Sequence, residues 1–192
     1  MSISTFTLLA LVMHVLADFH FQWEGLARSK QARLTGLVLH GLIYAAAMSS
    51  LLLLDWTIWP AIAIIAASHL LMDAFKKALQ TRLGEKGEFA LFLADQALHI
   101  LVIVLCLEVL WKPLATWPLW PSRDSIKWVL LLLLITKPAN LVMKMLMKRY
   151  TVLPKAGQDI TVAGAGAMIG SLEQILVAIL LGLSQFAAVG LV

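Results

Sequence analysis

The chain has 192 residues, of which 61% are hydrophobic and 14% are charged, and its formal net charge is +4. Soluble domains carry roughly 45–50% apolar and about 25% charged residues, so this composition excludes an ordinary soluble domain. The positive charge does not indicate a nucleic-acid-binding protein, because the basic residues lie in short segments between apolar runs, as membrane topology requires. We therefore predict no nucleic-acid partner.

Long apolar segments divide the chain into about six stretches of about 20 residues each, the length of helix that crosses a hydrocarbon core of roughly 30 Å. No segment alternates with period two, so the sequence predicts an all-α, polytopic transmembrane helix bundle. We expect one transmembrane domain over residues 1–192, with a four-helix core in 1–110 and two further helices in 111–192. In chain order the predicted spans are Ser4–Gln22, Leu34–Leu54, Ile58–Lys77, Phe89–Leu110, Ile126–Leu146 and Met168–Val189.

Basic residues gather in alternate loops, after the first, third and fifth predicted spans. By the positive-inside rule these loops face the cytoplasm, so both termini are expected outside. We predict a multi-pass protein of the bacterial inner (cytoplasmic) membrane, in contact with membrane lipid. The basic residues of the three loops are Arg28, Lys30, Arg33, Lys76, Lys77, Arg82, Lys86, Lys144, Lys148, Arg149 and Lys155.

Polar residues inside the predicted spans form three histidine–aspartate pairs with a spacing of four, which places both members on one helix face. Successive spans run in opposite directions. The topology therefore predicts an aspartate layer nearer the cytoplasm and a histidine layer about 6 Å deeper, from a rise of about 1.5 Å per residue. His40, on the second span, falls close to the aspartate layer. The pairs are His14 with Asp18, His69 with Asp73, and Asp95 with His99.

An unpaired ionisable group in lipid costs several kcal/mol, so these side chains are expected to face one another inside the bundle. A mixed carboxylate and imidazole set suits zinc, manganese or iron, and helix bundles build dimetal sites from such sets. A polar network of interhelical hydrogen bonds without metal is the alternative. In the metal hypothesis the cofactor is a divalent cation, zinc or manganese, and the ligands are His14, Asp18, His69, Asp73, Asp95 and His99.

Three further ionisable residues are predicted to take part in catalysis. His40 is expected as a ligand or a general acid–base group. Lys137 precedes Pro138, which should kink its span, and this lysine either neutralises an aspartate or stabilises negative charge on a substrate. Glu173 is open to three interpretations: an extra ligand, an acid–base group or an interfacial residue.

Several of these motifs resemble a bacterial membrane family known as domain of unknown function 3307. The resemblance rests on His40 and on three segments of this chain: His14-Val-Leu-Ala-Asp-Phe-His-Phe-Gln, His69-Leu-Leu-Met-Asp-Ala-Phe-Lys and Asp95-Gln-Ala-Leu-His. Ile169-Gly-Ser-Leu-Glu-Gln resembles a C-terminal element of longer members, in which Arg is more usual at the position of Gln174. The family implies no activity. Its motif style is loosely similar to that of membrane-bound metal-dependent hydrolases, which is an analogy only.

The predicted function is a metal-dependent membrane hydrolase that acts on a lipid or another amphiphile. A bound divalent metal lowers the pKa of water toward neutrality and so generates a nucleophile. One alternative is a transporter for a metal ion, or for protons coupled to a solute, since buried His and Asp also mark such pathways. Another is a non-catalytic assembly subunit in which the polar cluster serves helix packing.

Overall fold

The computed structural model describes residues 3–83, 87–113, 122–147 and 165–190. Within these ranges the regular elements are helices and no strand occurs, which confirms the all-α prediction. The chain divides into two compact units, residues 1–130 and residues 131–192. The single-domain organisation expected from the sequence stays a prediction.

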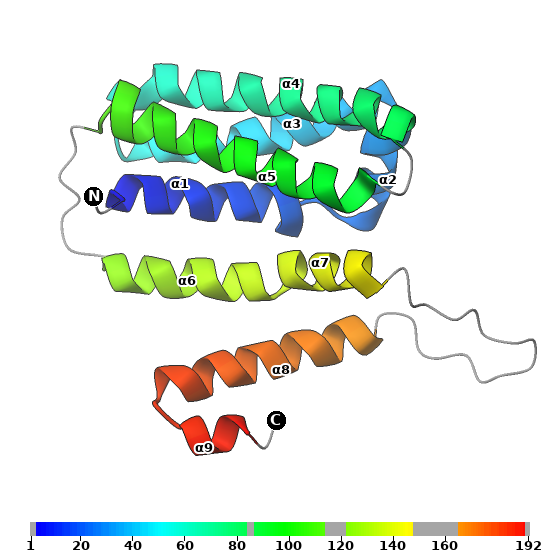
Figure 1. Cartoon of the computed structure of the whole chain (residues 1–192). Helices are drawn as coiled ribbons and strands as arrows, with labels where there is room; N and C mark the ends of the chain where they lie inside the picture. Colours follow the sequence, from blue (N-terminus) through cyan, green and yellow to red (C-terminus); the bar gives the residue numbers. More distant parts are fainter. Residues whose placement is uncertain (1–2, 84–86, 114–121, 148–164, 191–192) are drawn as a thin grey trace, which may run out of the picture. The chain divides into compact units, whose positions relative to one another are not determined.

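The first unit is a bundle in which four helices lie side by side, with a shorter helix, α2, across one end (Figure 1). Its α-helices are α1 (Thr5–Val15), α2 (Glu24–Ala32), α3 (Leu34–Ser49), α4 (Trp59–Leu83) and α5 (Glu88–Val104). Two π-helical segments, η1 (Leu16–His20) and η5 (Leu105–Leu110), extend α1 and α5, and two 3₁₀ segments, η2 (Ser50–Leu53) and η3 (Trp56–Ile58), connect α3 to α4.

Four helices of the described residues are long and apolar enough to cross a membrane: Leu34–Leu53, Trp56–Arg82, Glu88–Leu110 and Arg123–Met147. The first predicted span differs, because Thr5–His20 bends by 84° into Glu24–Ala32. The second part, α2, is polar and has Leu26 as its buried residue, so it suits a membrane surface better than its interior. The sixth predicted span corresponds to a shorter apolar helix, Gly166–Gly182. A count of six stays a prediction.

The outer faces of the bundle are apolar. Leu42 on α3, Leu71 on α4 and Leu101 on α5 are 62%, 70% and 50% exposed. Exposed apolar surface of this extent is the normal face of a helix in contact with lipid, and a soluble monomer rarely presents it. The chain is therefore a helical membrane protein. Beneath these faces, a core of residues such as Met48, Ile65 and Cys106 holds the helices together.

Glycine permits a close approach between α2 and α3. A Cβ atom at Gly36 would collide with the backbone carbonyl of Ser29, so a residue with a side chain does not fit there. Gly41 similarly faces Leu70 across the contact between α3 and α4. These two positions let α2 and α4 pack tightly against α3.

The second unit contains the helices α7 (Lys137–Met147), α8 (Ala165–Gly182) and α9 (Phe186–Val189), and the boundary between the two units falls within α6 (Arg123–Ile135). The helix is interrupted at Thr136, as Pro138 predicts, because proline lacks the N–H that would continue the ladder. The Thr136 hydroxyl lies within hydrogen-bond distance of two preceding carbonyls. Asn140 joins α7 to α8 by donating to Oγ of Ser171 over 2.6 Å.

Candidate metal centre

A buried polar cluster occupies the interior of the first unit. All six residues predicted as ligands, and His40, belong to it, and each is at most 8% exposed. They come from four parts of the chain: α1 with η1, α3, α4 and α5. Asp18 lies in the π-helical segment η1, a type of local widening that is frequent at functional sites. The predicted convergence of the three histidine–aspartate pairs is therefore present.

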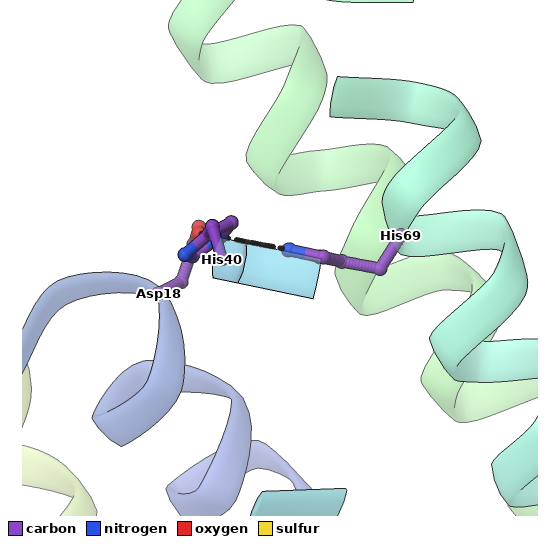
Figure 2. Close-up of side chains that lie close together, drawn as sticks. All are labelled: Asp18, His40 and His69. Carbon is purple, nitrogen blue, oxygen red and sulfur yellow. Dashed lines mark hydrogen bonds and ion pairs between the residues drawn. The ribbon is translucent and has the colours of Figure 1, made fainter. Parts of the chain in front are cut away.

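Ligand atoms of Asp18, His40 and His69 lie within 4.8 Å of one another, and Oδ2 of Asp73 lies beside the two histidines. Asp18, His40 and His69 approach one another from η1, α3 and α4 (Figure 2). Nε2 of His40 lies 3.1 Å from Nε2 of His69 and 3.1 Å from Oδ1 of Asp18. Oδ2 of Asp73 lies 3.5 Å from Nε2 of His40 and 3.3 Å from Nε2 of His69. Nε2 of His69 lies 3.9 Å from Oδ1 of Asp18.

Hydrogen bonds alone cannot pair all of these nitrogen and oxygen atoms well. A neutral imidazole carries one N–H. If each Nε2 donates to the carboxylate beside it, two N–H groups face each other over the 3.1 Å between His40 and His69. If one of the two is unprotonated, its lone pair faces a carboxylate oxygen. A cation between Asp18, His40 and His69 would be attracted by the ligand atoms of all three, with Asp73 beside the two histidines. The donor set therefore fits a metal ion.

A second group lies beside the first. His69, Asp73 and His99 are all buried, and each offers one ligand atom within 4.8 Å of the others. Both ring nitrogens of His99, as well as Oδ1 of Asp73 and Oδ1 of Asp95, are buried without a hydrogen bond in the described structure. Buried polar atoms without partners are rare, because each costs roughly 1–3 kcal/mol. This group therefore has unused bonding capacity.

Two lysines enter the cluster. Nζ of Lys30, on α2, lies 2.7 Å from Oδ2 of Asp73 and 3.9 Å from Oδ1 of Asp18. Nζ of Lys76 donates to Oδ2 of Asp95 over 2.7 Å. From the sequence, both lysines were expected only as basic residues of cytoplasmic loops, and these contacts were not predicted. The signal for Lys76 was its position three residues after Asp73, one turn along the same helix.

His14 occupies the edge of the cluster and belongs to neither ligand group. Its Nδ1 pairs with the hydroxyl of Tyr44 at 3.1 Å, and its Nε2 pairs with Oε1 of Gln96 at 3.3 Å. The Gln96 amide in turn donates to Oδ2 of Asp18 over 2.8 Å. His14 thus contacts groups that orient the ligands, and its predicted role as a ligand has no ligand group to support it.

The side chains of the predicted aspartate layer lie in contact with those of the predicted histidine layer. Side chains tilt toward the N-terminus of their helix. In α4 the later residue, Asp73, therefore leans back toward His69, and Oδ2 lies 3.3 Å from Nε2. In α5 the order is reversed, and Nδ1 of His99 lies 3.8 Å from Oδ1 of Asp95. The 6 Å spacing of the backbone positions consequently becomes direct contact between side chains.

Lys137 and Glu173, both predicted as catalytic, lie in the second unit. Lys137 is the first residue of α7, and Glu173 lies in the middle of α8. Their catalytic roles stay predictions, and the ligand groups are formed by residues of the first unit.

Comparison with known families gives one match, to the family described as "Protein of unknown function (DUF3307)", over residues 6–144. The chain belongs to this family. The matched residues include α1 to α5 and every member of the polar cluster, and they end within α7. No curated protein and no solved structure matched the chain.

Proposed function

We propose that this protein is a metal-dependent membrane hydrolase that cleaves a lipid or another amphiphile. The observation that carries the proposal is the spacing of four atoms, one each from Asp18, His40, His69 and Asp73. Five separations among them range from 3.1 to 3.9 Å. A tetrahedral zinc ion with bonds of about 2.0–2.2 Å requires ligand–ligand separations of about 3.3–3.6 Å. Two of the five separations fall within that range, and the other three lie within about 0.3 Å of it.

Catalytic zinc sites commonly use three protein ligands and keep the fourth position for water. Asp18, His40 and His69 supply such a set, with two nitrogens and one carboxylate oxygen. A bound divalent cation makes water a nucleophile near neutral pH. Asp73, whose Oδ2 lies beside the two histidines, would accept the proton of that water. Lys30, 2.7 Å from Asp73, is placed to stabilise negative charge that develops on a substrate oxygen.

The membrane setting supports an amphiphilic substrate. The cluster lies inside a bundle whose outer faces are apolar, and Lys30 reaches it from α2, the polar helix across one end. The side chains of Phe21 and Trp23, directly before α2, are 48% and 55% exposed. Aromatic and basic residues in this combination favour the membrane interface, where the headgroup of a lipid lies.

Metal content is the first test. Protein purified in detergent should carry stoichiometric zinc or manganese by mass spectrometry, and Asp18→Asn or His69→Ala should lower the metal content by at least one ion per chain. His20→Ala and Asp124→Asn are matched controls, because neither residue belongs to a ligand group in the described structure. If the wild-type protein binds neither zinc nor manganese on titration, the hydrolase proposal is wrong.

Hydrolysis itself requires a second test. Loaded protein in vesicles of bacterial phospholipid should release a polar headgroup or a fatty acid, detected by mass spectrometry. Chelation should stop the release, and Asp73→Asn should slow it roughly 10²–10⁴-fold, the usual contribution of a general base. Metal-loaded protein that cleaves none of these lipids would exclude phospholipid as the substrate and leave other amphiphiles to be tried.

Proton-coupled transport is a second candidate, favoured by a continuous run of imidazoles. Ring centroids are 5.2 Å apart from His40 to His69, 4.4 Å from His69 to His99, and 5.6 Å from His99 to His14. Such a series also suits proton transfer. Reconstituted protein would then carry protons into vesicles in the presence of a chelator, and His99→Phe would abolish the flux. A purely structural subunit would show neither metal-dependent hydrolysis nor flux.

A further inference from the structure

We infer that the centre is dinuclear, with a second divalent cation bound between Asp73, His99 and Asp95, next to the position proposed above. This inference rests on the proposed function and concerns the same polar cluster. The four atoms of the first position do not include either nitrogen of His99 or any atom of Asp95. A metal ion at the first position therefore does not bind the nitrogens of His99 or the oxygens of Asp95.

The first support is the unused bonding capacity of His99. This side chain is 2% exposed, and neither ring nitrogen makes a hydrogen bond in the described structure. Its nearest carboxylate is Asp95, with Oδ1 3.8 Å from Nδ1, which is too long for a hydrogen bond. An imidazole buried in this way loses its hydration without compensation. A metal ion bound to one nitrogen would supply the missing interaction.

The second support is the geometry of Asp73. Its Oδ2 faces the first position and Lys30, whereas its Oδ1 is buried and makes no hydrogen bond. A carboxylate that has an unused oxygen, and that offers a ligand atom within 4.8 Å of one from His99, suits a bridge between metals, as in the carboxylate–histidine centres of helix bundles. Asp95 repeats the pattern, because Oδ2 is held by Lys76 and Oδ1 is unpartnered. Each of the two carboxylates thus has an oxygen without a hydrogen bond in the described structure, and both residues lie near His99.

Charge sets the chemistry of the ligand that this centre would take. With neutral imidazoles, three carboxylates and two lysine ammonium groups leave the cluster with one net negative charge. Two divalent cations make it strongly positive inside a low-dielectric bundle. A bridging hydroxide and an anionic substrate group would offset that charge. The inference therefore favours an anionic amphiphile, such as a phosphate ester, and two-metal sites are well suited to phosphate esters.

Titration of metal-free protein with Mn²⁺ alone tests the inference. The wild-type chain should bind two ions, and its electron paramagnetic resonance spectrum should show the exchange coupling of a close pair. His99→Ala and Asp95→Asn should each bind one ion, with the hyperfine pattern of an isolated Mn²⁺. Asp18→Asn should also bind one, at the other position, and His20→Ala should still bind two.

The outcomes separate the two proposals. One Mn²⁺ per wild-type chain without exchange coupling overturns the dinuclear centre and leaves the mononuclear hydrolase intact. No binding at all overturns both. If His99→Ala fails to fold, the wild-type spectrum still decides the question, because exchange coupling requires a second ion close to the first.

Discussion

The phenol ring of Tyr44 lies parallel to the imidazole of His69, with 3.5 Å between the ring centroids and 4° between the planes. The same tyrosine pairs through its hydroxyl with Nδ1 of His14. One side chain on α3 therefore fixes the orientation of two histidines on other helices. Stacking of this kind limits rotation of the His69 ring and directs its Nε2 toward Asp18, His40 and Asp73.

Replacement of Tyr44 tests this positioning role. Tyr44→Leu removes the stacked ring and should weaken zinc binding about 10–100-fold, the usual effect of losing a group that orients a ligand. Tyr44→Phe keeps the ring and should bind zinc nearly as tightly as the wild type. Competition with a coloured chelator measures both affinities. Equal losses in the two variants would assign the effect to the hydroxyl and to His14.

Replacement of Lys30 should destabilise the metal-free protein more than the zinc-bound protein. Lys30→Met leaves Asp73 and Asp18 buried without their ammonium, and breaking a buried pair costs about 3–5 kcal/mol. A bound divalent cation replaces part of the lost charge. Thermal unfolding in detergent should therefore show a larger stabilisation by zinc in Lys30→Met than in the wild type. Lys77→Met, one residue after Lys76, is the control. An equal response to zinc in all three proteins would contradict the argument.

Gly36 should be intolerant of a side chain. Gly36→Ala places a Cβ against the backbone of Ser29, so α2 must move away from α3 and carry Lys30 with it. Overpacking of this kind costs about 1–3 kcal/mol. Gly166→Ala is the matched control, because its Cβ would meet no atom within 4 Å in the described structure. Denaturation curves compare the two variants. Equal stabilities would show that α2 can move away from α3 without a loss of folding free energy.

Membrane orientation can be checked by cysteine labelling in a Cys106→Ser background. Ser122→Cys should react with an impermeant thiol reagent added outside cells, whereas Gln80→Cys should react only after the membrane is permeabilised. The expectation rests on the distribution of Lys and Arg among the loops. The reverse pattern of labelling would place both termini in the cytoplasm.

The helical fold and the meeting of His69, Asp73, Asp95 and His99 were predictable because both depend on periodicity. A spacing of four fixes one helix face, and the cost of ionisable groups in lipid requires such faces to meet. His40 was also placed correctly beside the aspartates, from depth alone.

The role of α2 could not be predicted in the same way. The sequence predicted a loop at residues Glu24 to Ala32 because they are polar and basic, although they contain good helix formers. The return of this helix over the cluster depends on an 84° bend and on the contact at Gly36, which involves residues on two helices. Neither the bend nor the contact at Gly36 produces a periodic pattern in the sequence, so Lys30 was interpreted only as a basic residue of a cytoplasmic loop.

The polar residues of α1 and η1 have a consequence for biosynthesis. His14 and Asp18 find their partners on α3 and α5, which are made later. An aspartate costs up to about 2.5–3.5 kcal/mol on insertion scales, the value for the centre of a membrane helix, and Asp18 lies near the end of Thr5–His20. We therefore expect the integration of this helix into the bilayer to depend on α3 and α5, which supply the partners of His14 and Asp18.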